Sequence, residues 1–501
     1  MSASEECHEC PYREQVVALQ AELATLRAEL DTVGDLRGQL DELKRHVFGQ
    51  RSERMPSVAD ELRSRGKQGV PADPAVIQQK RRENKVRREG VVEERVEYSV
   101  PVEDRVCPRC GGTQFTKLGQ GKATTVYDYV PGHMVKRVIV QETLACRCGE
   151  CVLTAPAPAK VVEQGKYGAG FMAHIVVRKC GDQNPVYRLE KDFKRLGIPM
   201  ARSTMNDLFH SSADKLRRLW TRNLELVAAS DVVFADETPV KVQAKKKCRR
   251  GFVWTFIAQT EPTRKDSPTL VSFRFSESRS GETPKQVLGG SKGTLVVDGY
   301  TGYNNVVDPE GRIRSGCLAH ARRKFFDALP SAPKAREALD LILEVYGVER
   351  EAAQQGIART DRHAELRTQR SRPAMEKLRQ WLEHEQGLAP PKSRLGKAIA
   401  YAVNNWEHLT VFLSDPCLPP DNNISERHLR PIAVGRKNWM FLGNAEAGEN
   451  FCGLQSLVST CEANGVNPLA YLTDVLARID DHPARKLDDL LPHRWAPISA
   501  D

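Results

Sequence analysis

The sequence predicts a multidomain protein of mixed α+β and α/β structure, and three observations support that fold class. A heptad repeat of apolar residues occupies residues 11–49, and closely spaced cysteine pairs occur within residues 91–155. At residue 231 helical periodicity gives way to short β-rich runs. A chain of 501 residues is also too long for one compact core, which favours roughly three domains.

Composition excludes a membrane protein. Hydrophobic residues make up 40% of the chain, which is ordinary for a globular protein. No stretch approaches the roughly 18–20 uninterrupted apolar residues of a membrane span. The first ten residues, MSASEECHEC, have neither the basic start nor the apolar run of a signal peptide. We therefore expect a cytoplasmic protein with no membrane partner.

Basic residues are clustered rather than spread evenly. The net charge of +10 arises from 75 Lys and Arg against 65 Asp and Glu. One cluster lies at residues 80–88 (KRRENKVRR) and another at 241–250 (KVQAKKKCRR). Such clusters suit nucleic acid, because they displace counterions from phosphates. A solvated surface or a linker would explain either cluster equally well.

Residues 11–49 are predicted to form a coiled coil. Apolar residues recur every seven positions, and a companion series lies three or four residues away, as in an a/d seam. The companion series fails at Arg37 and Lys44, so the first three heptads carry the prediction. We expect a homo-oligomer through this segment; the alternative is an amphipathic helix packed on its own chain. The two series are Leu19, Leu26, Val33, Leu40 and Val47, and Val16, Leu23 and Leu30.

Residues 50–90 read as a polar basic linker, and residues 91–155 as a zinc ribbon-like module. Two CxxC turns can place four thiolates around one tetrahedral Zn²⁺, and a cytosolic chain keeps such cysteines reduced. A structural zinc site is therefore predicted, with Cys146 as an alternative to Cys148. Reduced, non-ligating cysteines are the other interpretation, and the CxxC of Cys7 and Cys10 stays unassigned. The predicted ligands are Cys107, Cys110, Cys148 and Cys151.

Residues 160–228 are predicted to be helical and to bind DNA. Helices are expected over 168–179, 185–195 and 203–211, with a Gly-containing turn at 196–199 and Ser203 as an N-cap. Helix, turn and helix is the layout that places a second helix in the major groove. An ordinary helical hairpin is the alternative. The expected DNA contacts are Arg202, Ser203, Thr204 and Asn206.

Residues 229–450 are predicted to form an RNase H-like core. Strands are expected at 231–236, 252–259, 269–275 and 293–298, with a short helix at 284–288. In that fold the fourth strand lies beside the first, so two strand-end acids, Asp236 and Asp298, should meet. Two acids that close strands in matching positions outweigh the usual interpretation of a lone strand-end Asp as a cap.

The remainder of the chain is predicted to be helical. Residues 331–415 read as a helical insertion within the core, and residues 451–501 as a C-terminal helical segment. Between them a helix is expected to begin at Glu426 and to stop at Pro431. A helix placed against the sheet can supply a third carboxylate, but the residues alone do not select Glu426 among the later glutamates.

Carboxylates gathered in this way suit metal-dependent phosphodiester chemistry. Two Mg²⁺ ions about 3.5–4 Å apart activate a hydroxyl and stabilise the departing oxyanion. Mg²⁺ prefers hard oxygen ligands and keeps several waters, so a few carboxylates suffice. The same cations remove the repulsion between crowded acids.

Three motifs then identify a resemblance. They are ADETPVKVQ around Asp236, VVDGYTGYN around Asp298 and DNNISERHLRPIAVGRKNW around Glu426. The C-terminal SLVSTCEANGVNPLAYLTDVLARI adds to them. Over nearly its whole length the chain resembles DDE transposases of the insertion-sequence-66 type. The resemblance implies that Asp236, Asp298 and Glu426 form the acidic triad that holds two Mg²⁺, or Mn²⁺.

Further residues near the motifs are weaker candidates. Cys317 and His320 form a Cys-x-x-His like that of many transposases with a helical insertion; His320 would contact DNA or the scissile phosphate, orient the site wall, or merely pack. Glu237 adjoins Asp236, but strand alternation points it to the opposite face. Phosphate contacts are expected from Arg322, Arg323 and Lys324, and from Arg427 and Arg430 unless these form salt bridges. Asn423, Arg436, Lys437 and Trp439 would guide a DNA strand.

The resemblance implies cleavage at the ends of a bacterial insertion sequence, followed by attack of the freed 3′-hydroxyl on target DNA. The expected partners are double-stranded DNA, as terminal repeats and as target, a second copy of the chain, and accessory proteins of the same element. Two alternatives remain: a nuclease or resolvase that cuts without joining, and a non-catalytic regulator that only binds DNA.

Overall fold

The structure is a computed structural model that describes residues 167–497 except 198–199, 246, 262–266 and 308–310. It also describes two short strands and scattered helical positions before residue 167. The chain divides into two units, residues 59–155 and residues 1–58 with 156–501. The predicted zinc ligands and the basic run at 80–88, apart from Arg82, lie outside the described residues.

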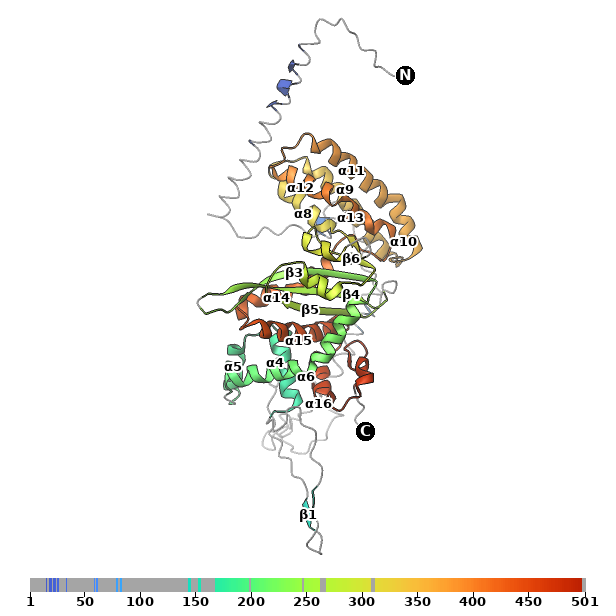
Figure 1. The fold of residues 1–501 in the computed structure, drawn as a ribbon. Helices are drawn as coiled ribbons and strands as arrows, with labels where there is room; N and C mark the ends of the chain where they lie inside the picture. Colours follow the sequence, from blue (N-terminus) through green and yellow to red (C-terminus); the bar gives the residue numbers. More distant parts are fainter. Residues whose placement is uncertain are drawn as a thin grey trace, which may run out of the picture. The chain divides into compact units, whose positions relative to one another are not determined.

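A five-stranded mixed sheet lies at the centre of the larger unit (Figure 1). Its strand order is β5-β4-β3-β6-β7, with β3 antiparallel to β4 and parallel to β6. Three antiparallel strands, a short helix α7 (Glu282–Leu288) and a parallel fourth strand follow the predicted order. The strands are β3 (Val232–Val242), β4 (Arg249–Gln259), β5 (Thr269–Ser276), β6 (Thr294–Val296) and β7 (Ile313–Ser315).

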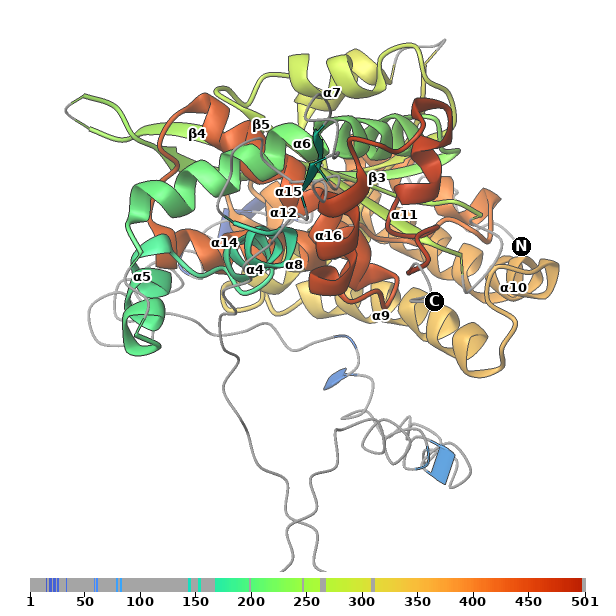
Figure 2. The same ribbon diagram turned by 90° about the horizontal axis from the view of Figure 1, so that it is seen from below.

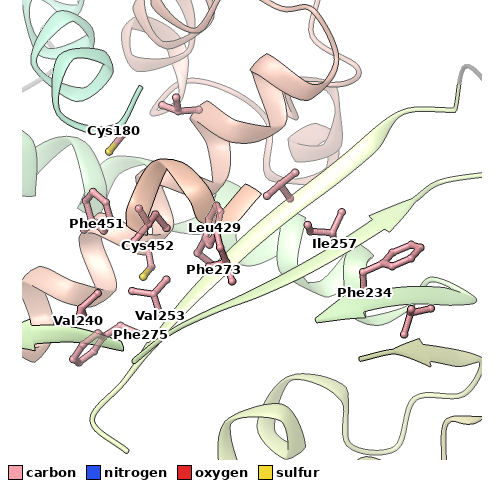
Figure 3. Close-up of a cluster of buried hydrophobic side chains, with 14 of the residues drawn as sticks. Cys180, Phe234, Val240, Val253, Ile257, Phe273, Phe275, Leu429, Phe451 and Cys452 are labelled. Carbon is pink, nitrogen blue, oxygen red and sulfur yellow. The ribbon is translucent and has the colours of Figure 1, made fainter. Parts of the chain in front are cut away.

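The two faces of the sheet bury different cores. On β3, Val233 and Ala235 face a small core with α7 and the 3-10 helix η2 (Thr301–Val306). Phe234 and Val240 face the larger core, where α14 (Asn423–Trp439) and α15 (Ala445–Ala463) contribute Leu429 and Phe451 (Figure 3). Each fully buried large apolar side chain contributes about 1.5–3 kcal/mol, so this alternation fixes which face each polar residue on β3 takes.

Helices α4 (Ala169–Cys180), α5 (Val186–Arg195) and α6 (Arg202–Ala228) precede the sheet. Gly197 adopts a φ of +76° in the predicted turn, which a glycine tolerates without strain. The N-cap prediction is wrong: Ala201 caps α6 without a side-chain bond, because the helix starts at Arg202 and Ser203 already lies within it. Helix α6 also reaches β5 and α15, so this segment packs onto the sheet (Figure 2).

The predicted helical insertion is present: residues 331–415 form helices joined by short loops and contain no strand. It packs beside the edge strand β7. Its buried Arg367 donates to Glu349 Oε1 and Oε2 and to three backbone carbonyls, while His363 Nε2 lies 3.3 Å from Glu349 Oε1. Helix α8 (Leu318–Ala328) precedes the insertion, whose helices are α9 (Ala335–Gln354), α10 (Asp361–Leu366), η3 (Arg367–Ser371), α11 (Arg372–Gln386), α12 (Arg394–Asn404), α13 (Trp406–Thr410) and η4 (Val411–Ser414).

Helix α14 (Asn423–Trp439) follows the insertion. The expected stop at Pro431 is wrong, because the helix runs through this proline for two more turns. An interior proline costs about 3 kcal/mol, and burial of Leu429, Ile432 and Gly435 beside β3 and β4 offsets that cost.

Helix α15 (Ala445–Ala463) packs across β5 and spans the predicted boundary between residues 450 and 451. Helix α16 (Pro468–Arg478) and the 3-10 helix η5 (Ala484–Leu490) end the described chain. Among the described residues, no helix is both long and apolar enough to cross a membrane.

In the smaller unit, strands β1 (Thr143–Ala145) and β2 (Val152–Thr154) pair in an antiparallel hairpin. They flank residues 146–151, which contain the second group of predicted zinc ligands. In residues 11–49, all of the described positions are helical.

Candidate active site

Asp236 lies within a strand and not at its end as predicted. Strand β3 continues to Val242, and Asp236 is paired with Thr255 of β4. The apolar run stops at Ala235 because pairing with β6 stops at Phe234. Beyond that point β3 pairs with β4 and, near its end, forms a single bridge between Val242 and Leu442.

Asp236 lies on β3, and Asp298 takes the equivalent position two residues beyond the end of the neighbouring parallel strand β6, so it does not end the strand as predicted. Phe234 pairs with Val296, and each acid follows two residues later. Because side chains alternate along a strand, both acids take the face of Phe234 and Val296. Strands β3 and β6 are parallel neighbours as predicted, and the charge of Asp298 contributes to the raised pKa of Asp236; the catalytic pairing of the two acids stays a prediction.

Asp298 is held by its own loop and by β7. The Tyr300 amide donates to Asp298 Oδ1 at 2.9 Å. Arg314 Nη2 donates to the carbonyls of Asp298 and Tyr300 at 2.5 and 2.8 Å. The Arg314 side chain is buried, so this guanidinium is a structural clasp that sequence analysis did not find. The feature of the sequence that could have revealed this role is the arginine at the centre of the three-residue strand IRS.

Glu426 lies in the first turn of α14, whose start is anchored beside Asp236. The Asn422 side chain donates to the Ala235 carbonyl at 2.7 Å. The Asn422 amide donates to Cys317 Sγ at 3.3 Å. Helix α14 packs on the face of the sheet that carries Asp236, and the charge of Glu426 contributes to the raised pKa of Asp236.

The acids interact electrostatically. Burial first, and then the charges of Glu237, Asp298 and Glu426, together raise the pKa of Asp236 to about 7, against one hydrogen bond donated by the Glu237 amide. Each unit of such a shift is about 1.4 kcal/mol of preference for the neutral form. A nearby cation would reverse that preference.

The carboxylate donor set fits a hard divalent cation. The raised pKa of Asp236, pushed up by burial and by Glu237, Asp298 and Glu426, marks a place where positive charge is stabilising. Over the described residues, no three Asp, Glu, His or Cys side chains are yet close enough to surround one ion.

His320 lies against the third acid. Its Nε2 is 3.8 Å from Glu426 Oε1, and Arg323 Nη2 is 3.6 Å from the same oxygen. His320 Nδ1 is buried without a hydrogen-bond partner among the described residues. Cys317 is buried, and burial raises the pKa of its thiol to about 12, so it serves as a neutral hydrogen-bond acceptor.

The structure separates the other predicted basic residues by their surroundings. Arg322 is buried. Lys324 Nζ lies 4.8 Å from the Tyr401 ring centroid. Arg436 donates to Thr238 Oγ1 and to the Pro239 carbonyl at 3.0 and 2.7 Å, which ties α14 to β3. The exposed residues of the predicted set are Arg202, Ser203, Asn206, Arg323, Lys324, Asn423, Arg427, Arg430 and Lys437.

Two of the remaining candidates are engaged within the chain. Asn423 donates through its amide and side chain to Asp421, at 3.0 and 2.6 Å. Trp439 Nε1 donates to Gln183 Oε1 at 3.2 Å. On α6, Arg202 pairs with Glu190 at 2.7 Å, whereas Thr204 is half-buried.

A pocket of about 560 Å³ lies between the insertion and α14. Phe234 lines it from the sheet, and Asp421 and Arg427 line it near the start of α14. The pocket therefore adjoins the face that carries the acids.

Sequence comparisons identify the class of protein. The family model described as Transposase IS66 family matches residues 164–450. The IS66 C-terminal element matches residues 456–493. The zinc-finger binding domain of transposase IS66 matches residues 104–149, a span that ends before Cys151. The chain belongs to the IS66 transposase family: it is a DNA transposase with a zinc-finger domain.

Similar curated proteins come from Sinorhizobium fredii and are described as uncharacterized. Protein y4jD is 32% identical over 487 residues, which cover 92% of this chain and 94% of y4jD. Protein y4qI is 30% identical over 508 residues, covering 96% and 94%. Protein y4hP is 29% identical over 496 residues, covering 92% and 89%.

Proposed function

We propose that this transposase cleaves and joins DNA at the ends of a bacterial insertion sequence, using a DDE site in an RNase H-like core. Asp236, Asp298 and Glu426 would bind two Mg²⁺ or Mn²⁺ ions. The observation that carries the proposal is the common face: Asp236 on β3 and Asp298 just beyond the end of β6 follow paired residues by the same two positions, and α14 packs on β3 and β4.

Each acid has its own support. Asp236 is held by the sheet, Asp298 by the Tyr300 amide, and Glu426 by the helix that Asn422 anchors. Bound divalent ions would supply activation of the attacking hydroxyl and charge stabilisation at the leaving oxygen. The three acids would hold those ions and close around them, since their carboxylates are not preassembled in the structure.

The reaction on the DNA would proceed in two steps. Water attacks the phosphorus at the element's end and the 3′-oxygen leaves as a hydroxyl. That hydroxyl then attacks a target phosphodiester, and one P–O bond forms as another breaks. Arg323 is half-exposed beside Glu426, so it would hold the phosphate.

The N-terminal half would supply assembly and DNA recognition. Four apolar residues of the heptad repeat are helical and more than half exposed: Leu19, Leu23, Leu26 and Val33. Such exposure is expected where a coiled-coil seam would be covered by a second copy of the chain. Predicted zinc ligands Cys107, Cys110, Cys148 and Cys151 would hold a structural Zn²⁺. The exposed start of α6 would enter the major groove of the terminal repeat. Accessory proteins of the same element remain a prediction.

The test uses the full chain with DNA that contains its own element end and flank. Asp236→Asn, Asp298→Asn and Glu426→Gln should each abolish Mg²⁺-dependent cleavage and strand transfer while end binding persists. Glu446→Gln is the matched control, because Glu446 is exposed in the first turn of α15. Full activity in any triad variant would refute the site.

The same assay separates the alternatives. Cleavage without joined products would indicate a nuclease or resolvase. Binding of the ends without Mg²⁺-dependent nicking would indicate a regulator.

A further inference from the structure

We infer that Glu237, Arg279 and Tyr300 form a link that positions Asp298, so that Glu237 is a positioning residue and not a metal ligand. This inference rests on the proposed function, because it assigns a role relative to the same acids. Glu237 lies on the face of β3 opposite Asp236.

The Glu237 carboxylate is already fully engaged on that face. Its side chain is 4% exposed and lies beside Tyr303 of η2. Arg279 Nε and Nη2 lie 2.7 and 2.5 Å from Glu237 Oε1. Tyr303 donates its hydroxyl to Oε2 at 2.9 Å. Both oxygens therefore have partners that fix the carboxylate away from Asp236.

Arg279 carries the link to the loop that contains Asp298. Its guanidinium lies 4.1 Å from the Tyr300 ring centroid. The Tyr300 hydroxyl donates in turn to the Arg279 carbonyl. Because the Tyr300 amide donates to Asp298 Oδ1, the position of the Tyr300 residue sets the orientation of that carboxylate.

The loop at Gly281 packs closely against the backbone of the loop at Gly302. A Cβ on Gly302 would lie 2.2 Å from the Tyr300 ring, and one on Gly281 would lie 2.3 Å from the Gly302 carbonyl. Trp254 and Tyr303 complete the aromatic cluster, with ring centroids 5.8 Å apart. The link is therefore built on the small core beneath the sheet.

Asp298 needs such support because it lies two residues beyond the end of β6, where ladder hydrogen bonds no longer hold it. A displacement of about 1 Å can cost a catalytic group about 100-fold in rate. Arg314 fixes the backbone carbonyls of this loop from β7. The Glu237–Arg279–Tyr300 link would fix it from β3.

The test measures Mn²⁺ binding to the full chain by calorimetry without DNA, and Mn²⁺-dependent end cleavage beside it. Arg279→Gln should weaken Mn²⁺ affinity about tenfold, as losses around metal ligands typically do. Tyr300→Phe, which removes only a hydroxyl, should weaken it less. Arg249→Gln is the matched control, because it breaks the exposed Arg249–Glu277 ion pair near the hairpin and should leave Mn²⁺ affinity unchanged.

A double variant distinguishes the link from direct ligation. If Glu237 acts through Arg279, then Glu237→Gln, Arg279→Gln and the double variant should show the same loss of Mn²⁺ affinity. Loss of binding in Glu237→Gln with unchanged binding in Arg279→Gln would make Glu237 a ligand and overturn the inference. Unchanged affinity in both single variants would overturn it too.

Asp298→Asn distinguishes a failure of the Glu237–Arg279–Tyr300 link from a failure of the proposed active site. If it weakens Mn²⁺ binding while Arg279→Gln does not, only the link fails. If Asp298→Asn leaves Mn²⁺ affinity unchanged, the proposed active site itself is wrong.

Discussion

The side chain of Asn422 donates a hydrogen bond of 2.7 Å to the carbonyl oxygen of Ala235. One bond thus joins the N-cap of the helix that carries Glu426 to the residue that precedes Asp236. The first and third acids are separated by the whole insertion in sequence, and this contact fixes the distance between their elements.

Asn422→Ala should therefore reduce both stability and cleavage. The Ala235 carbonyl would lose its side-chain partner in a buried position, which costs about 1–3 kcal/mol of unfolding free energy. Urea unfolding and end cleavage measure the two effects. Asn438→Ala is the control, because this half-buried side chain on the same helix makes no hydrogen bond within the described part of the chain. Equal stability of the two variants would contradict the anchoring role.

The raised pKa of Asp236, caused first by burial and then by neighbouring carboxylates, predicts how stability depends on pH without metal. The folded pKa of about 7 exceeds the ordinary aspartate pKa of 3.8, which the unfolded chain keeps, so the folded state binds more protons between these two pH values. Stability from this group is full below pH 4 and is lost as the pH rises to about 7.

Asp236→Asn should remove that loss. The difference in unfolding free energy between the variant and the wild type should grow from pH 4 to pH 7, by up to about 4 kcal/mol, and then level off. Thermal unfolding in chelator measures it. Mg²⁺ should raise the wild-type melting temperature more at pH 8 than at pH 5, because protons compete for Asp236. A flat difference curve would disprove the raised pKa.

Two neighbouring cations on α14 should behave differently when neutralised. Arg436 bonds to Thr238 and Pro239, so Arg436→Gln should cost about 1–2 kcal/mol of stability. Lys437 is exposed, so Lys437→Gln should leave stability unchanged and lower the salt dependence of DNA binding by about one unit of slope. Binding titrations at several salt concentrations decide. The opposite pattern would mean that Arg436 contacts DNA.

The exposed start of α6 should provide sequence specificity. Asn206 is exposed, while Met205 and Phe209 beside it are buried. Asn206→Ala should weaken binding of the terminal repeat by about 1–3 kcal/mol and leave binding of unrelated DNA unchanged. Competition between the two DNAs measures this. Equal loss for both would place Asn206 on the backbone and not in the groove.

Much of the sheet was predictable because its apolar runs are continuous. The runs that end near Asp236 and Asp298 located both strands, and parallel pairing brought these acids together. Glu426 was different: it lies on a helix after a long insertion, and no local pattern marks it. Only the family resemblance selected it.

The misplaced details have physical causes. Pro431 is a strong helix stop by itself, yet packing of α14 on β3 and β4 carries the helix through it. Arg322 looks like a phosphate ligand within an ARRK run, but its position on α8 turns it inward, as burial shows. Arg314 and Arg279 act through contacts between loops that are distant in sequence, and one-dimensional patterns do not contain such contacts.

The insertion leaves and rejoins the core at one place. Leu318 donates its amide to the Pro420 carbonyl at 2.9 Å, and Asn422 donates its amide to Cys317 at 3.3 Å. The roughly hundred residues between Leu318 and Pro420, which comprise α8 and the insertion, behave as a loop whose two ends are held together by these hydrogen bonds. The entropy cost of closing such a loop changes only slowly with its length. An insertion of a different size could therefore replace this one while Glu426 keeps its position beside the sheet.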